Sequence, residues 1–160
     1  MKKKRIFVLT VCVCLLGLAA IAALSRRETG QVGPSKPFKD LQASEIISVS
    51  VTLTPPDTTI LIYDESNARN DAQMKDQINA RNELVECLKK IVIYNKDNSY
   101  RDYVGQYATF TLTMADGTQK RVMAYNPFFV INGVGYKTKY EPCEALNSYA
   151  NRLLELQQAD

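Results

Sequence analysis

The sequence predicts an α+β fold: an antiparallel sheet with two helices packed on one face, preceded by one N-terminal transmembrane or signal helix. Three observations lead to this class. The chain starts with basic residues and a long apolar run, several later segments alternate apolar and polar residues as strands do, and two segments carry apolar residues at helical spacing. After the N-terminal helix, the expected order of elements is β-β-α-β-β-β-β-β-α.

The N-terminal segment predicts membrane targeting. Four basic residues after the first methionine are followed by residues 6–24, which carry no charge, and then by two arginines. As a helix this run extends about 28 Å, close to the thickness of a bilayer's hydrocarbon core. Because positive charge stays cytoplasmic, residues 28–160 are expected outside, in a single-pass cell-membrane protein. We favour an uncleaved anchor at 1–27. The alternative is a signal peptide cleaved near residues 20–22, which gives a secreted protein.

The exported part is expected to consist of a linker and one domain. Residues 28–38 contain two glycines and two prolines with few large apolar groups, which indicates a tether. Residues 39–158 suffice for a single extracytoplasmic domain that buries about two-thirds of its unfolded surface. Six of the 20 basic residues lie in the targeting segment, which leaves 14 basic and 17 acidic residues and a net charge near −3. A basic stripe is not visible, so no nucleic-acid partner is expected.

The domain begins with a predicted pair of strands. Residues 47–53 alternate apolar and polar side chains with the period of a strand that buries one face. The Pro-Pro-Asp sequence at 55–57 ends this strand, and residues 59–63 predict the returning one. Residues 64–80 are polar, and they fit either a solvated loop or the first half of a helix.

The first helix of the domain is clear from residue 82 onward. Residues 91–94 predict a strand entered directly from this helix, residues 95–99 a turn, and residues 100–105 an irregular segment. The apolar residues that fall on one face of the helix are Leu84, Cys87, Leu88 and Ile91.

The clearest local prediction is a hairpin centred on the Asp-Gly pair at 116–117, a pair that tight two-residue turns prefer. Strands at 107–115 and 118–125 flank it. Centring the turn on this pair sets the register of the hairpin, and Phe110 then lies opposite Met123.

An Asn-Gly pair at 132–133 marks a second hairpin, in which Phe129 lies opposite Tyr136. The closing helix is expected to begin at Pro142, because proline suits the first helical position, and to end near Leu156. The residues of its core-facing stripe are Cys143, Leu146, Ala150 and Leu153.

Catalytic chemistry is poorly supported. The chain has no histidine, the commonest general base and metal ligand. Cys143 lies in the first turn of the closing helix, where the helix dipole lowers a thiol pKa, but a nucleophile still needs a base. Three interpretations stay open: packed thiols, a disulfide between Cys87 and Cys143 outside the cell, and a hydrolase, which is the weakest.

No metal and no cofactor is expected. Asn95, Asp97 and Ser99 have the alternating oxygen ligands of a calcium loop. Tyr100, however, stands where the loop glycine belongs, and Gln106 stands where the closing glutamate belongs. A turn with self-capping polar side chains is the simpler interpretation.

Tyrosines gather in the second half of the chain, where eight of the nine occur. A tyrosine has an apolar ring and a polar tip, so exposed tyrosines suit recognition of a sugar or a peptide, although strands also favour aromatic residues that simply pack. We expect the pair in the irregular segment to be exposed. The candidate ligand-binding residues, all weakly indicated, are Tyr100, Tyr103, Tyr125 and Tyr136.

A set of motifs from residue 98 onward is distinctive: Asn-Ser-Tyr at 98–100, Phe-Thr-Leu-Thr-Met-Ala-Asp-Gly-Thr at 110–118, Ala-Tyr-Asn-Pro-Phe at 124–128, Ile-Asn-Gly-Val-Gly-Tyr-Lys-Thr at 131–138 and Tyr-Glu-Pro-Cys-Glu at 140–144. With these motifs, residues 38–156 resemble uncharacterised anchored or secreted extracytoplasmic domains of clostridial-type Gram-positive bacteria. They also resemble extracellular segments of sensor-peptidase-like proteins similar to the antibiotic-sensing metallopeptidases. The peptidase zinc motif is missing here, so the resemblance implies an accessory or sensing domain and supplies no catalytic residue.

Together these observations predict a non-catalytic extracytoplasmic binding or sensing domain, tethered to the cell envelope through residues 6–24. Its expected partner is a protein, a peptide or a cell-wall-derived ligand. The alternative is a small exported inhibitor or immunity-type protein that occludes a partner enzyme.

Overall fold

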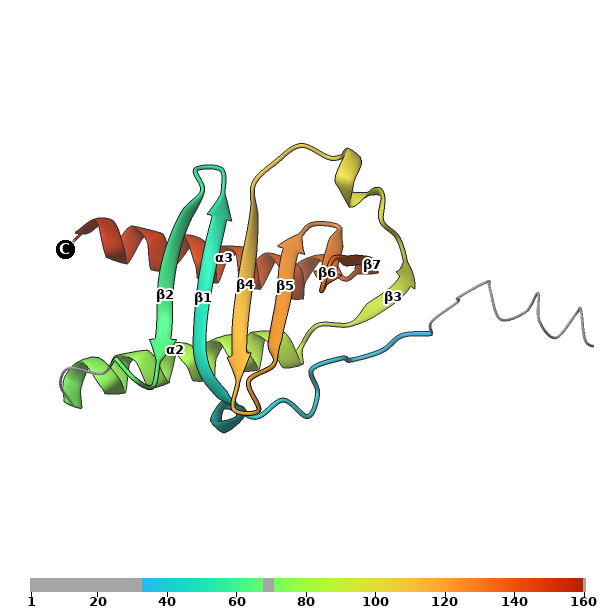
Figure 1. Ribbon diagram of the computed structural model, residues 1–160. Helices are drawn as coiled ribbons and strands as arrows, with labels where there is room; N and C mark the ends of the chain where they lie inside the picture. Colours follow the sequence, from blue (N-terminus) through green and yellow to red (C-terminus); the bar gives the residue numbers. More distant parts are fainter. Residues whose placement is uncertain (1–32, 68–70, 160) are drawn as a thin grey trace, which may run out of the picture. The chain divides into compact units, whose positions relative to one another are not determined.

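The computed structural model describes residues 33–67 and 71–159, which belong to one compact unit (Figure 1). The fold is α+β, with a seven-stranded antiparallel sheet and two α-helices, and both the class and the order of elements are as predicted. The predicted transmembrane or signal helix lies outside the described residues. In the described part of the chain, no helix combines the length and the apolar character that crossing a bilayer requires.

The strands are arranged in the order β2-β1-β4-β5-β6-β7-β3, and every neighbouring pair is antiparallel. The first two strands confirm the predicted pair. The bounds are β1 (Ile46–Thr54), β2 (Thr58–Asp64), β3 (Ile93–Lys96), β4 (Tyr107–Met114), β5 (Gln119–Tyr125), β6 (Phe128–Ile131) and β7 (Val134–Thr138).

The two α-helices are α2 (Asp71–Lys89) and α3 (Tyr140–Ala159), and Figure 1 shows both behind the sheet. Two short 3-10 helices, η1 (Ala43–Glu45) and η2 (Ser99–Asp102), complete the elements. Residues 64–80 were expected to be either a solvated loop or the first half of a helix, and the structure shows a helix from residue 71 onward. Helix α3 starts two residues before the predicted Pro142 and continues past Leu156.

Strand β3 begins two residues later than predicted because the preceding helix ends in a tighter turn. The N–H of Lys90 donates to the carbonyl of Cys87 at 3.2 Å, and the N–H of Ile91 donates to Leu88 at 3.0 Å. Such bonds, with a spacing of three residues, satisfy carbonyls at a helix end and keep Ile91 out of the strand.

The core lies between the sheet and the helices. Tyr149 of α3 stacks on Phe110 of β4 with ring centroids 6.2 Å apart, and its hydroxyl donates to the carbonyl of Ala80 in α2 at 2.9 Å. One side chain thus joins both helices to the sheet. Side chains buried to 2 % exposure or less include Val49, Val51, Leu53, Leu84, Leu88, Phe110, Leu112, Val122, Leu146 and Ala150.

The compact unit begins inside the predicted linker. Ser35 pairs with Ile93 through two backbone hydrogen bonds of 2.9 Å, which adds a short bridge beside β3. Phe38 is buried, and its ring meets that of Phe129 edge-on at 6.0 Å. The segment just before residue 39 is therefore packed against the sheet.

The β4–β5 hairpin has a register one residue away from the prediction. Phe110 pairs with Val122 and not with Met123. The connection is a three-residue loop, in which Gly117 has a φ of 81° and donates its N–H to the carbonyl of Met114 at 2.9 Å. A loop of this kind ends in a left-handed glycine, whereas the prediction assumed a two-residue turn.

This one-residue difference changes which side chains lie on each face of the sheet. Val122 and Ala124 are buried in the core beside the helices, whereas Arg121 and Met123 share the opposite face with Thr109. The second hairpin confirms its prediction. Phe129 pairs with Tyr136, and both residues of the connecting turn at 132–133 have positive φ, as a two-residue turn of this class requires.

The face of the sheet away from α2 and α3 is partly covered by the segment that contains η2. Tyr100 lies directly over Gly135 of β7, where a Cβ atom would stand 2.6 Å from the tyrosine Cδ1 and 2.2 Å from the carbonyl oxygen of Asp97. Glycine at 135 therefore permits the close approach of the covering segment. We call the side of the sheet opposite the helices the open face.

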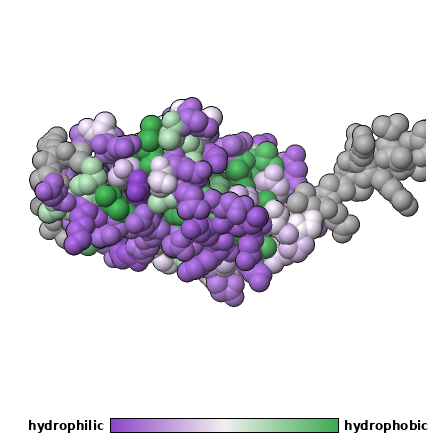
Figure 2. All heavy atoms as spheres, turned by 90° about the horizontal axis from the view of Figure 1, so that it is seen from below, coloured by the Kyte–Doolittle hydropathy of each residue, from purple (hydrophilic) through white to green (hydrophobic). Residues whose placement is uncertain are grey.

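The side of the domain seen from below is polar over much of its area. Figure 2 shows the molecule from below, with hydrophilic residues predominating and apolar residues in small, separate patches. Scattered apolar residues are normal on a protein surface. The more informative surface feature is the concave area on the open face.

Candidate ligand-binding groove

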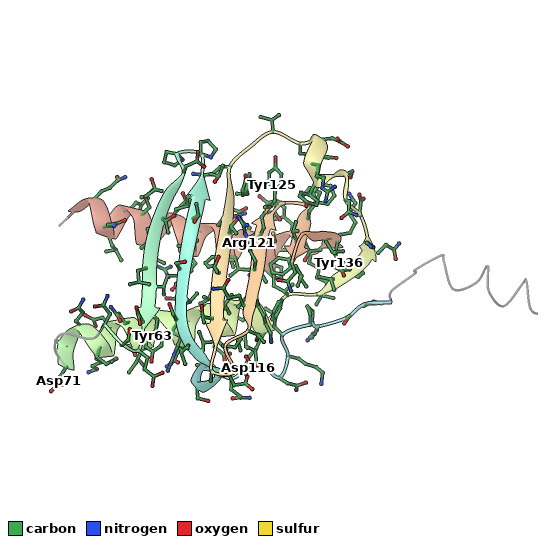
Figure 3. The ribbon with its side chains drawn as sticks, viewed as in Figure 1. Tyr63, Asp71, Asp116, Arg121, Tyr125 and Tyr136 are labelled. Atoms are coloured by element: carbon green, nitrogen blue, oxygen red, sulfur yellow. The ribbon has the colours of Figure 1, made fainter. Side chains whose placement is uncertain are left out.

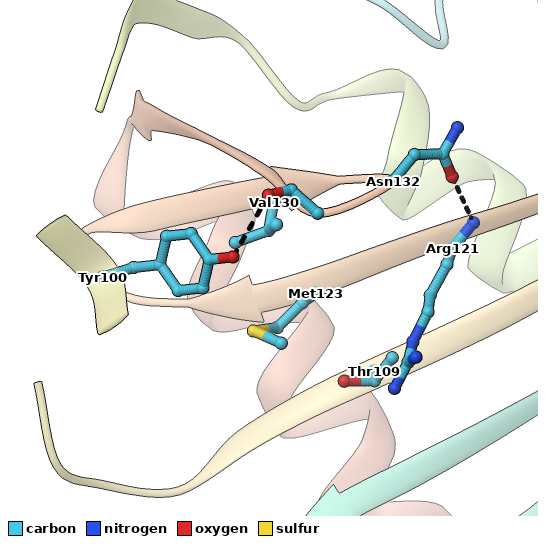
Figure 4. Close-up of a pocket in the computed structure, with 7 residues that line it drawn as sticks. Tyr100, Thr109, Arg121, Met123, Val130 and Asn132 are labelled. Atoms are coloured by element: carbon cyan, nitrogen blue, oxygen red, sulfur yellow. Dashed lines mark hydrogen bonds between the residues drawn. The ribbon is translucent and has the colours of Figure 1, made fainter. Parts of the chain in front are cut away.

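A hollow of about 440 Å³ lies on the open face of the sheet (Figure 4). Its floor follows a row of directly paired residues, in which Thr109 of β4 faces Met123 of β5 and Met123 faces Val130 of β6. Paired residues share a face of a sheet, so register alone places these three together. The hollow is lined by Tyr100, Thr109, Arg121, Met123, Val130, Asn132 and Gly133.

The floor combines apolar and polar groups. Val130 is 2 % exposed, and Met123 is half-buried beside it. Thr109, which is 4 % exposed, contributes a buried hydroxyl to this floor. Ligand pockets in proteins typically have this composition, with an apolar lining and a few fixed polar groups.

Tyr100 forms one wall of the hollow, and its position is fixed by several contacts. Its hydroxyl donates to the carbonyl of Gly133 at 3.2 Å and accepts from Nε of Arg101 at 3.4 Å. Its ring also leans against the ring of Phe128, with centroids 6.4 Å apart. A wall held in this way does not need to be ordered when a ligand binds.

Arg121 reaches into the same hollow from β5. Its backbone N–H donates to Oδ1 of Asn132 at 2.9 Å, which ties the strand to the turn of the second hairpin. Figure 4 shows its side chain extending along the hollow to end beside Thr109. The ion pairs found among residues 33–67 and 71–159 do not include Arg121.

A second hollow of about 190 Å³ adjoins the first and shares Tyr100 and Met123 with it. Tyr107 and Tyr125 lie side by side in it, with ring centroids 5.2 Å apart. Burial, and then the neighbouring Tyr107, raises the pKa of Tyr125 above its ordinary value. We refer to the two hollows together as the tyrosine groove, and the smaller hollow is lined by Tyr100, Arg101, Tyr103, Tyr107, Met123 and Tyr125.

Three of the four tyrosines predicted as ligand-binding residues line this groove: Tyr100, Tyr103 and Tyr125. The expectation of an exposed pair holds for Tyr103, which is 53 % exposed, but Tyr100 is half-buried by its contacts with β7 and the second hairpin. Tyr136 is not brought to the groove. It pairs with Phe129 and packs against the core on the helix side of the sheet, away from Tyr125 (Figure 3).

Eight lining residues were not identified as ligand-binding from the sequence: Arg101, Tyr107, Thr109, Arg121, Met123, Val130, Asn132 and Gly133. The predicted register placed Met123 beside Phe110 on the core face, so Met123 was not considered as a residue of the groove. The signal that would have corrected it is the apolar pair Val122 and Ala124, because both belong in the core once the loop contains three residues.

Cys87 and Cys143 are free thiols, so the disulfide alternative is not formed in this structure. Cys143 is fully buried and its thiol lies 3.4 Å from the carbonyl of Phe128, to which it donates. Burial raises the pKa of this thiol to about 12, and burial, followed by Glu83, raises the pKa of Cys87. The interpretation as packed thiols therefore describes Cys143, which is protonated at neutral pH and poorly suited to nucleophilic attack.

The polar turn before η2 is a self-capped turn. The carboxylate of Asp97 accepts the N–H of Ser99 at 2.9 Å and pairs with Lys137 at 3.3 Å. Oδ1 of Asn98 accepts the N–H of Gly135 at 2.8 Å, which fastens the turn to β7. In the described part of the chain, no group of three or more acidic, cysteine or histidine residues is placed to hold a metal ion.

Comparison with protein-family models, curated proteins and solved structures finds no match to this chain.

Proposed function

We propose that this protein is a non-catalytic extracytoplasmic binding or sensing domain, tethered to the cell envelope, and that its ligand occupies the tyrosine groove. The observation that carries the proposal is a concave, aromatic-walled groove on the face of the sheet that α2 and α3 leave free. Binding sites are concave and mostly apolar, with a few fixed polar groups. The groove has this composition.

The rigidity of the groove supports recognition. Its floor consists of paired strands, and its wall, Tyr100, is held by hydrogen bonds on both sides of its hydroxyl. A preformed site loses little conformational entropy when a ligand binds. A rigid sheet that presents aromatic side chains is therefore well suited to a peptide or cell-wall-derived ligand.

The extracytoplasmic address rests on the sequence. The basic start and the uncharged run at 6–24 favour export of everything that follows. The resemblance to anchored and secreted domains points the same way. A protein positioned so would meet envelope components and secreted molecules before cytoplasmic ones.

The proposed absence of catalysis is supported by the state of the one cysteine considered as a nucleophile. Cys143 is fully buried with a raised pKa, and the chain contains no histidine to act as its base. The groove itself is lined by side chains that bind rather than react at neutral pH: tyrosine, arginine, threonine and methionine.

Methionine methyl groups provide the test. The chain has four methionines, of which Met123 lies in the groove, whereas Met74 and Met114 lie elsewhere in the domain. The full-length chain in detergent micelles, with isotope-labelled methionine methyl groups, is titrated with a peptide mixture and with a soluble peptidoglycan digest. The Met123 signal, assigned by its loss in M123L, should shift while the signal of Met74 stays in place. No shift of Met123 with either mixture would refute the role of the groove.

A second candidate function, the exported inhibitor, has one observation in its favour. Val104 is fully exposed, next to the half-exposed Tyr103, on the segment that borders the groove. Single exposed apolar side chains are normal, whereas adjacent ones that form a patch mark contact with another protein, and these two residues are neighbours in the sequence. An inhibitor of this kind would lose affinity for its enzyme in the variant V104D, measured by surface plasmon resonance, without a change in the Met123 response.

A further inference from the structure

The tyrosine groove is cationic. Arg121 lies in the larger hollow and Arg101 in the smaller one, and neither hollow is lined by an acidic residue. Acidic residues outnumber basic ones, by 17 to 14, once the six basic residues of the targeting segment are set aside from the 20. A cationic groove on an acidic domain attracts a ligand of opposite charge.

Three hydrogen-bond acceptors in the wall of the groove are already engaged. The carbonyl of Gly133 accepts from the hydroxyl of Tyr100, whose oxygen in turn accepts from Arg101. Oδ1 of Asn132 accepts the backbone N–H of Arg121. Beside Tyr100 and Asn132, a ligand group that donates hydrogen bonds therefore meets acceptors that are already in use.

Hydrogen-bond donors that can reach a ligand, by contrast, lie at one end of the larger hollow. The guanidinium group of Arg121 makes none of the ion pairs formed within the described residues, and Figure 4 shows it beside Thr109, whose hydroxyl can also donate. A planar guanidinium matches the two oxygens of a carboxylate with two parallel hydrogen bonds. The hydroxyl of Thr109 adds a third donor on the same side.

The remainder of the groove is apolar or aromatic. Met123 and Val130 form the floor beside the charged end, and the rings of Tyr103 and Tyr107 line the adjoining hollow. A side chain next to the anionic group of a ligand would lie over this floor and against these rings, where burial of apolar area adds to affinity.

We propose that the tyrosine groove binds a peptide carboxylate, with Arg121 as its anchor and the apolar floor and tyrosine rings around the neighbouring side chain. This inference rests on the proposed function and names the ligand class of the same site. The carboxylate is either the free C-terminus of a peptide or an acidic side chain within it, and the two sources share the chemistry that Arg121 recognises.

A phosphate group fits the groove less well. Phosphate sites collect backbone N–H groups at a helix N-terminus or several cationic side chains around one anion. The larger hollow offers one guanidinium and one hydroxyl, and it is lined by strands, a turn and the short η2. Two or three donors match a carboxylate, which carries a single charge.

The experiment compares short peptides that carry a carboxylate with one that carries none, and with inorganic phosphate. Acetyl-Phe-Ala with a free carboxylate, acetyl-Phe-Ala-amide, acetyl-Phe-Asp-amide and inorganic phosphate are titrated into the full-length chain in micelles, with the Met123 methyl signal as the readout. At least one of the two carboxylate peptides should bind about tenfold tighter than acetyl-Phe-Ala-amide, because a charge-assisted, bidentate bond is lost in the amide. Whichever carboxylate peptide binds tighter identifies the source.

Two variants distinguish a specific contact with Arg121 from a general effect of positive charge. R121Q should abolish the difference between the carboxylate peptide and its amide. K120Q, which removes the same charge from the adjacent residue of β5 on the other face, should keep it. Unchanged signals of Met74 and Met114 show that each variant is folded.

The outcomes test the carboxylate ligand separately from the proposed role of the groove as a binding site. Equal binding of the carboxylate peptides and the amide, at the Met123 signal, would overturn the carboxylate proposal and leave the groove as a binding site. Tighter binding of phosphate than of either carboxylate peptide would overturn it too, as would a carboxylate preference that survives in R121Q. If no probe shifts Met123, the carboxylate proposal fails, and the titration with peptide and peptidoglycan mixtures decides separately on the groove itself.

Discussion

The two faces of the sheet are built from the same strands but have different roles: one packs against the helices, and the other carries the tyrosine groove. On the side of α2 and α3, β4 contributes Phe110 and Leu112, which are fully buried. On the open face, the same strand contributes Tyr107 and Thr109 to the tyrosine groove. We infer from this difference that side chains on the helix side contribute most of the folding stability, and that side chains on the open face bind the ligand. Substitutions on the two faces should therefore have separable effects.

The largest effect on stability is expected when a large side chain is removed from the helix side of the sheet. F110A should lower the free energy of unfolding by about 3–5 kcal/mol, because the change leaves a cavity where the ring stacked on Tyr149. Urea unfolding followed by circular dichroism measures it. The neighbouring T111A, on the open face and half-buried, is the control and should cost well under half as much. Equal losses would contradict the division of labour between the faces.

A glycine on the open face gives the next largest effect, and it should affect both stability and binding. G135A places a methyl group into the carbonyl of Asp97 and the ring of Tyr100, which forces the η2 segment away from β7. We expect a loss of about 1–3 kcal/mol in the free energy of unfolding, as for other overpacked sites, and an altered Met123 signal. G33A is the matched control, since its added Cβ meets nothing within 4 Å. A G135A protein as stable as G33A would show that the covering segment is not held against β7.

A smaller effect is expected from the hydroxyl that joins the two helices. Y149F removes the hydrogen bond to the carbonyl of Ala80 and keeps the ring stacked on Phe110. The free energy of unfolding should fall by about 0.5–1.5 kcal/mol, and the Met123 signal should not change. Thermal unfolding of Y149F beside Y140F, whose tyrosine is largely exposed, gives the comparison. A shifted Met123 signal in Y149F would mean that the faces are coupled.

The smallest expected effect concerns pH and the turn that covers the open face. Hydrogen bonds from Ser99, followed by the neighbouring Lys137, lower the pKa of Asp97 below its ordinary value of 3.8. Because the folded-state pKa is the lower one, the stabilising contribution is present above the unfolded value and is lost as pH falls through the folded value. D97N should therefore flatten the drop in melting temperature between neutral pH and pH of about 3. An unchanged drop in D97N, measured beside D40N as an exposed control, would show that the turn does not contribute.

Local sequence patterns were sufficient for most elements of this fold. The alternation in β1, the helical spacing of Leu84 and Leu88, and the Asn-Gly turn at 132–133 all predicted what the structure contains. These patterns depend on neighbours within a few residues, so they can be recognised without knowing the rest of the fold. The candidate site was only partly accessible in this way: three of its tyrosines were identified, but Arg121 and Thr109 were not.

What the sequence by itself determined is the fold class, the order of elements and the two segments that close as hairpins. The tertiary structure alone decided the register of the first hairpin, the pairing of β1 with β4, and the face on which each tyrosine lies. The physical reason is that side-chain direction alternates at every residue of a strand, so a loop one residue longer reverses the faces. Which loop forms depends on burying Val122 and Ala124 against helices that are distant in the sequence.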